Sequence, residues 1–171
     1  MDKEKELPKR KPTRLQEFDY NTTGAYFITI CTDKRQQILS RIVGVDVLGD
    51  PKNVKLLTHG IVADKYIKQM SEFYDNVTVD QCVIMPNHIH LVLFVREDGT
   101  PRTSSPTKQT SFVSHFVSTF KRFCNKEIGN NIFQRGYMEH IIRDREDYET
   151  RAKYICENPT RWHYDKLYTE E

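Results

Sequence analysis

The chain has 171 residues and a mass of 20.3 kDa, which suits one compact domain. Hydrophobic residues make up 37% of it, enough to form a core, and the net charge of +2 argues against a polycationic nucleic-acid coat. No run approaches the roughly 18 apolar residues of a membrane span, and the first residues contain no apolar leader. We therefore expect a cytoplasmic protein with no membrane partner.

The cysteines lie far apart in the sequence and form no CxxC pair. This spacing favours free thiols over a metal site or a disulfide framework. The cysteines are Cys31, Cys82, Cys124 and Cys156.

Two polar segments are expected to lie outside the packed domain. Residues 1–17 predict a flexible basic arm, and the Ser/Thr/Pro-rich residues at about 99–110 predict a mobile loop within the domain of residues 18–171. The basic cluster of the arm could contact phosphate, and it could equally be a solvated tail. Its members are Lys9, Arg10, Lys11 and Arg14.

The hydrophobic pattern alternates between strand and helix periods along the chain. It predicts, in order, a strand at 25–32, a hairpin on a sheet margin at 38–57, a helix at 59–74, two antiparallel strands at 77–85 and 88–95, a helix from 112 that ends at Gly129, a strand at 137–142, and a helix that Asp144 caps and Asn158-Pro159 stops. This order predicts an α+β protein with a single antiparallel sheet and helices packed on it.

The strongest local signal is a His-x-His pair at the start of the second of the two adjacent strands. Side chains alternate between the faces of a strand, so His88 and His90 point the same way, about 7 Å apart at their Cα atoms. Two imidazoles at this spacing can converge on one divalent metal ion, although His-x-His on a strand also occurs without metal. A metal would need further ligands, and the last helix is the best candidate region.

Tyr154 lies about 120° from the apolar stripe of the last helix, and Asn158 follows it one turn later. Tyr154 could therefore project into a site, with Asn158 beside it as a ligand or hydrogen-bonding partner. The alternative is a boundary tyrosine whose hydroxyl lies in water.

Two segments together resemble the HUH single-tyrosine transposases, and the REP-associated tyrosine transposases and small insertion-sequence transposases most of all. The segments are VIMPNHIHLVLF, around His88 and His90, and FQRGYMEHIIRDREDYETRAKYICENPTRW, around Tyr154. The resemblance covers roughly residues 18–165. It implies a ferredoxin-like domain with the His strand in the centre of its sheet.

The resemblance also implies the roles of the site residues. His88 and His90 would bind Mg²⁺ or Mn²⁺, Tyr154 would be the nucleophile, and Asn158 would complete the metal site, where the insertion-sequence branch typically has Gln. The implied reaction is the metal-dependent cleavage and rejoining of hairpin-bearing single-stranded DNA through a 5′-phosphotyrosine. Whether Tyr154 serves its own chain or a homodimer partner stays open.

Phosphate contacts for such a substrate need cations near the site, and aromatic side chains can stack on bases. Besides the arm, the candidate DNA-binding residues are Lys121, Arg122, Arg135 and Arg143. Two other functions remain open at this point. One is a domesticated protein that binds hairpin DNA without turnover, and the other is a nicking enzyme of the replication-initiator type.

Overall fold

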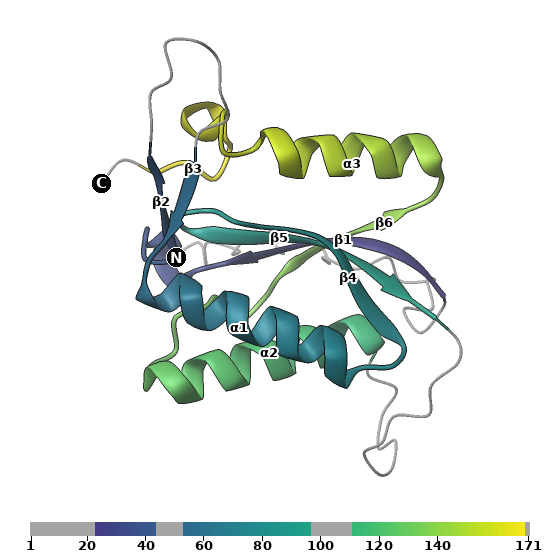
Figure 1. Ribbon diagram of the computed structural model, residues 1–171, viewed down its shortest axis with the longest axis horizontal. Coiled ribbons are helices and arrows are strands. Elements are labelled where there is room, and N and C mark those ends of the chain that lie inside the picture. Colours follow the sequence, from purple (N-terminus) through teal and green to yellow (C-terminus); the bar gives the residue numbers. More distant parts are fainter. Residues whose placement is uncertain (1–22, 44–52, 97–110, 170–171) are drawn as a thin grey trace, which may run out of the picture.

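The computed structural model describes residues 23–43, 53–96 and 111–169 (Figure 1). The basic arm, with Lys9, Arg10, Lys11 and Arg14, lies outside the described residues. The segment at 99–110 lies outside them as well. The predictions made for these two segments therefore stay predictions.

Four strands form one antiparallel sheet in the order β4-β5-β1-β6. The strands are β1 (Gly24–Cys31), β4 (Val77–Ile84), β5 (His88–Val95) and β6 (Met138–Ile142). With a helix after β1 and another after β5, this is the ferredoxin-like arrangement. The predicted fold class is confirmed, and β5, which carries the two histidines, lies in the centre of the sheet.

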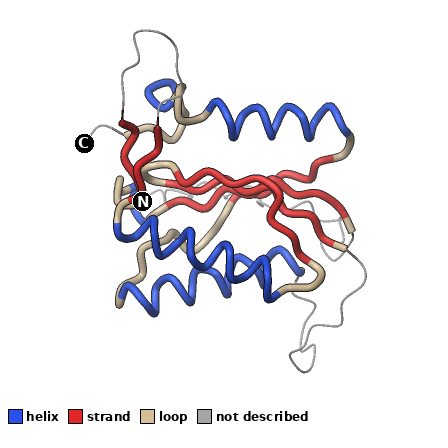
Figure 2. Tube along the Cα trace, viewed as in Figure 1, coloured by secondary structure: helices blue, strands red, loops and turns tan. Residues whose placement is uncertain are grey.

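The helices cover both faces of the sheet, two on one side and one on the other (Figures 1 and 2). Helices α1 (Thr58–Phe73) and α2 (Phe112–Ile128) lie together on one face, and α3 (Arg145–Glu157) crosses the opposite face. No helix in the described part of the chain has the length and apolar character needed to span a bilayer.

The helix ends follow from local chemistry. The side chain of Asp144 accepts a hydrogen bond from the backbone N–H of Asp147 at 2.9 Å and so caps α3, as predicted. Ser111 caps α2 in the same way, through the N–H of Ser114. Helix α2 ends at Gly129, whose φ of 83° is in the left-handed region that glycine adopts without strain.

Alternate side chains of β5 pack into two different cores. Ile89, Leu91 and Leu93 belong to the larger core under α1 and α2, whereas Val92 belongs to the smaller core under α3. The smaller core also holds Ile155 of α3. The residues that share the α3 face with Val92, including both histidines, therefore lie between the sheet and α3.

The predicted hairpin is present, but it forms a separate sheet. Among the residues that the structure describes, strands β2 (Ser40–Val43) and β3 (Asn53–Leu56) pair only with each other, antiparallel. The hydroxyl of Ser40 donates to the carbonyl of Ile84, and the N–H of Leu39 donates to the carbonyl of Pro86. These bonds attach the hairpin to the last residue of β4 and to the turn before β5. The hairpin therefore contacts the end of the four-stranded sheet and does not extend it as a further strand.

Two short 3-10 helices complete the described fold. They are η1 (Asp33–Arg35) after β1 and η2 (Trp162–Tyr164) after α3. The cysteines are free, as predicted, and Cys31 and Cys124 are buried.

Candidate active site

The two imidazoles lie side by side at the start of β5, beneath the last turns of α3. His88 pairs with Cys31 of β1 and His90 with Thr29, and both histidines are almost completely buried. Their ring centroids are 4.5 Å apart. The geometry agrees with the prediction that both side chains converge on one point.

Neighbouring side chains hold each imidazole through its Nδ1 atom. Asn87 Oδ1 accepts a hydrogen bond from His88 Nδ1 at 2.8 Å, and the Thr29 hydroxyl shares a 2.8 Å hydrogen bond with His90 Nδ1. Both Nε2 atoms are buried and have no hydrogen-bonding partner among the described residues. Buried polar atoms are rarely left unpaired, and these two nitrogens are available to a ligand.

The protonation state of His88 and His90 favours the binding of a cation. Burial, the largest cause, lowers the pKa of His88 to about 4 and that of His90 to about 3. Both rings are therefore neutral at neutral pH, which is the form that binds metal.

Asp165 brings a carboxylate to the same point, which the sequence analysis did not anticipate. One ligand atom each from His88, His90 and Asp165 lies within 4.8 Å of the others. Asp165 follows η2, and its Oδ1 accepts from the N–H of Leu167 at 2.6 Å. The carbonyl of Leu167 in turn accepts from Asn87 Nδ2 at 2.7 Å. Asn87 thus orients His88 and also holds the segment that carries Asp165.

Tyr154 of α3 reaches this cluster from the same chain. Its ring lies edge-on to His90, with centroids 5.2 Å apart, and its hydroxyl donates to Asp165 Oδ2 at 2.9 Å. The side chain is 40% exposed, but its hydroxyl is bonded to Asp165. Tyr154 is therefore part of the cluster and is not a boundary tyrosine whose hydroxyl lies only in water. Burial and then the Asp165 carboxylate raise the pKa of the Tyr154 hydroxyl to about 12.

Asn158 also lies in the cluster, at the end of α3. Its amide nitrogen donates to Asp165 Oδ2 at 2.8 Å, so Asp165 accepts from Tyr154 and Asn158 together. Its Oδ1 is buried and has no hydrogen-bonding partner in the described part of the chain. The amide oxygen is thus available to a ligand.

The predicted DNA-binding cations fall into two groups. Lys121, Arg122 and Arg135 gather at the carboxyl-terminal part of α2, around one open pocket. This pocket adjoins the end of the sheet that carries His88, because Gln134 N donates to the carbonyl of Cys31. Arg143 lies at the other end, beside the pair formed by Ala25 and Ile142.

Lys121 differs from the other cations because protein atoms surround its ammonium. It donates to the carbonyls of Gln134 and Gly136 at 2.8 and 2.7 Å, and burial lowers its pKa to about 8. Lys121 therefore fastens the loop before β6 to α2. His140 has a comparable structural contact, a 2.7 Å pair with Asp147 that joins β6 to α3.

Three residues of the site were not predicted from the sequence, and they differ in whether the sequence could have revealed them. Asn87 directly precedes His88 in the MPNHIH segment, so its position in the sequence could have identified it as a residue of the site. Thr29 could be found only from the register of β1 against β5. Asp165 lies in an irregular segment with no periodicity, and only the fold brings it to the imidazoles.

Comparisons with known proteins bear on this arrangement. No protein-family model matches the chain. An "Uncharacterized protein" of Haemophilus influenzae is 32% identical over 94% of this chain and 94% of its own length. A "Putative REP-associated tyrosine transposase" of the same organism is 33% identical over 85% of this chain and 76% of its own length.

The fold also occurs among solved structures. A REP-associated tyrosine transposase bound to a REP hairpin matches with a TM-score of 0.61 and 20% sequence identity. The match covers 90% of this chain and 77% of that one.

Proposed function

Because the chain belongs to the family of REP-associated tyrosine transposases, we propose that it cleaves and rejoins hairpin-bearing single-stranded DNA through Tyr154. The observation that carries this proposal is the meeting of Tyr154 with two buried imidazoles whose Nε2 atoms are unpaired. A hydroxyl nucleophile beside a metal-binding pair is what phosphoryl transfer to tyrosine requires.

The residues present fit a divalent cation such as Mg²⁺ or Mn²⁺. His88, His90 and Asp165 would hold it, and the Asn158 amide oxygen is a further ligand atom in the same cluster. Two neutral nitrogens with oxygen ligands suit Mn²⁺ well and are compatible with Mg²⁺. When bound, the metal supplies positive charge that neutralises the scissile phosphate and orients it for in-line attack.

The chain's own residues then account for the transfer. The Tyr154 oxygen forms a bond to phosphorus, and the bond between phosphorus and the 3′ oxygen breaks. The hydroxyl proton leaves Tyr154, and the departing 3′ oxygen takes up a proton to become a free 3′-OH. The product is a 5′-phosphotyrosine that conserves the phosphodiester bond energy, so rejoining by a 3′-OH needs no nucleotide cofactor.

Asp165 and Asn158 position the nucleophile. The hydrogen bond from Tyr154 to Asp165 fixes the hydroxyl over the imidazole pair, and Asn158 holds the same carboxylate oxygen. Since the pKa of Tyr154 is raised to about 12, the hydroxyl needs added positive charge nearby before it loses its proton. Tyr154, His88 and His90 come from one chain, which supports cleavage by a single protomer.

The hairpin preference rests on the family and on its solved relative, which is bound to a REP hairpin. Arg122 and Arg135, near the His88 end of the sheet, are candidates to contact the phosphates of such a substrate. The arm residues Lys9, Arg10, Lys11 and Arg14, and Arg143 on the other end of the sheet, remain candidates from the sequence alone.

The test is cleavage of a hairpin oligonucleotide that carries single-stranded flanks, labelled at either end. With Mn²⁺, a 3′ label should become covalently attached to the protein, and a 5′ label should appear on a shorter strand that a polymerase can extend. Chelator, or His90→Ala, should abolish both products. Binding without either product under any metal would indicate a hairpin-binding protein, and a cleaved strand without an attached protein would exclude the tyrosine mechanism.

A further inference from the structure

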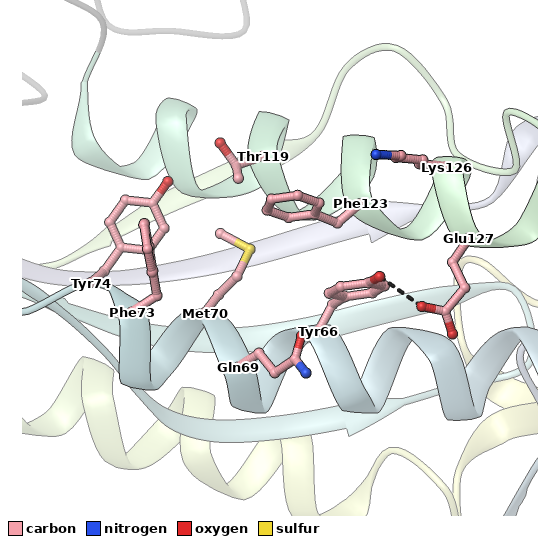
Figure 3. A pocket seen from close by; sticks show the side chains of 9 residues that line it. All are labelled: Tyr66, Gln69, Met70, Phe73, Tyr74, Thr119, Phe123, Lys126 and Glu127. Atoms are coloured by element: carbon pink, nitrogen blue, oxygen red, sulfur yellow. Dashed lines mark hydrogen bonds between the residues drawn. The ribbon is translucent and has the colours of Figure 1, made fainter. Parts of the chain in front are cut away.

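The outer surface of the α1–α2 layer carries an apolar groove that the catalytic cluster does not use. The groove has a volume of about 630 Å³ and lies between the two helices (Figure 3). Because α1 and α2 cover the face of the sheet opposite α3, this groove and the catalytic cluster lie on different sides of the molecule (Figure 1). Its lining residues include Tyr66, Met70, Phe73, Tyr74, Phe123 and Lys126.

One end of the groove carries a stacked aromatic pair. The rings of Tyr66 and Phe123 stack at 14° to each other with centroids 5.5 Å apart, and Phe123 is 38% exposed. The hydroxyl of Tyr66 donates to Glu127 at 2.6 Å, which fixes the orientation of the pair. The opposite end of the groove carries Phe73, which is 65% exposed (Figure 3).

The other flank of α2 carries a basic pocket of about 820 Å³. Lys126 lines this pocket and the groove alike, so the two form one continuous surface across α2. Arg122 lies between them, with its guanidinium 5.3 Å from the centre of the Phe123 ring. Within the described residues, no carboxylate forms an ion pair with Arg122, Lys126 or Arg135. The one acidic side chain of the groove, Glu127, is paired with Lys65 at 2.6 Å.

We propose that this α2 surface binds an unpaired stretch of the DNA substrate, with phosphates on Arg122, Lys126 and Arg135 and a base on the ring of Phe123, in the place that the Arg122 guanidinium occupies in the free protein. Unspecific single-strand sites combine these two elements, cations that follow the backbone and aromatic faces that stack on bases. The inference rests on the proposed function and adds a second place where the enzyme holds its substrate.

The alternative occupant of an apolar groove is another protein, including a second copy of this chain. Cations that have no acidic partner among the described residues fit an anionic strand better than an apolar protein surface. A protein partner would also cover the full groove, whereas a nucleotide fixed by Lys126 would reach only the Phe123 end. Phe73, at the far end, therefore distinguishes the two occupants.

The experiment measures DNA affinity by fluorescence anisotropy with the full chain carrying Tyr154→Phe, so that cleavage does not intervene. Three labelled hairpins are compared, with thymidine flanks, with abasic flanks of equal length, and without flanks. Phe123→Ala should weaken binding of the thymidine-flanked hairpin by about 5- to 150-fold, the range that one stacked base contributes. It should leave the other two affinities unchanged.

The charge variants should behave differently. Arg122→Gln and Lys126→Gln should weaken both flanked hairpins, and each should lower the salt slope of binding by about 0.7. Phe73→Ala serves as the matched aromatic control and should change nothing. Thermal unfolding of each variant establishes that it remains folded.

Three results would overturn the proposal. Equal losses for Phe73→Ala and Phe123→Ala, with a change of molecular mass in solution, would assign the groove to a second copy. Equal effects of Phe123→Ala on thymidine and abasic flanks would exclude stacking, and unchanged affinities in all variants would exclude the surface as a DNA site. None of these readouts depends on cleavage by Tyr154, so they separate this inference from the proposed function.

Discussion

The hydroxyl of Tyr154 and the carboxylate of Asp165 meet in a 2.9 Å hydrogen bond, although one lies on α3 and the other beyond η2. The same carboxylate lies within 4.8 Å of ligand atoms of both His88 and His90. Asp165 therefore links the Tyr154 hydroxyl to the imidazole pair, in addition to the direct contact between the rings of Tyr154 and His90.

Removing the charge of Asp165 should weaken metal binding. Asp165→Asn retains the size of the side chain but loses the anionic ligand, so we expect the affinity for Mn²⁺ to fall by about tenfold or more. Isothermal titration with Mn²⁺ measures this directly. Asp64→Asn, on the opposite layer and paired only with Lys68 in the described residues, is the control and should bind Mn²⁺ like the wild type. An unchanged affinity in Asp165→Asn would remove Asp165 from the metal site.

Asn87 should act on metal binding without touching the metal. Its side chain holds His88 and the carbonyl of Leu167, so Asn87→Ala frees both the imidazole and the Asp165 segment. Loss of such a supporting contact costs about 10- to 100-fold in metal affinity. Asn87→Asp, which still accepts from His88, should restore part of it.

The control for Asn87 is Asn76→Ala, because Asn76 is also buried but lies at the other end of the sheet, beside Arg96. Both alanine variants should lower the melting temperature, and only Asn87→Ala should lower Mn²⁺ affinity. Equal Mn²⁺ affinities in the two would reduce Asn87 to a packing role.

The buried imidazoles should make the metal-free protein sensitive to acid. The pKa values of His88 and His90, about 4 and 3, lie below the usual value of 6.5. Between about pH 6.5 and 4 the unfolded chain therefore binds more protons than the folded one. The free energy of unfolding must rise with pH in this window and fall as the pH drops, by up to about 1.4 kcal/mol per pH unit for each imidazole.

Urea unfolding in chelator across this pH range provides the measurement. His90→Gln should make the pH dependence shallower, because it removes one of the two imidazoles whose pKa is lowered. A wild type whose stability is flat between pH 6.5 and 4 would show that the imidazoles are protonated in the folded state.

Gly60 should be irreplaceable for a steric reason. A Cβ atom there would lie 1.9 Å from the carbonyl oxygen of Leu39, a backbone atom that also accepts from Leu57 N–H. Gly60→Ala should therefore destabilise the protein by about 1–3 kcal/mol. Gly136→Ala, where a Cβ would meet nothing within 4 Å, should change stability far less. Equal melting temperatures in the two variants would contradict the close packing of α1 on Leu39.

The periodic parts of the chain made the fold predictable. Strand and helix periods, the Asp144 cap and Gly129 located the elements, and the His-x-His spacing placed both imidazoles on one face. The separate sheet of β2 and β3 was not predicted. A hairpin can be recognised in a sequence, but the sequence pattern does not show whether its strands pair with another sheet. That outcome depends on tertiary hydrogen bonds such as the one from Ser40 to Ile84.

The site was predictable only in part, for a related reason. Helical spacing related Asn158 to Tyr154, but no sequence spacing relates either residue to Asp165, which an irregular segment brings back to the sheet. Conversely, Lys121 was predicted to contact phosphate because it is a cation near the site. Its ammonium instead donates to backbone carbonyls. Burial and hydrogen bonding, which the sequence does not display, distinguish a structural cation from an available one.

The most direct test of the central claim is to locate the covalent bond. The wild-type chain is incubated with Mn²⁺ and the flanked hairpin, digested with nuclease and protease, and analysed by mass spectrometry. The account predicts a nucleotide linked through its 5′ phosphate to the peptide that contains Tyr154, and no such peptide from Tyr154→Phe. A nucleotide on any other residue, or adducts that persist in Tyr154→Phe, would contradict it.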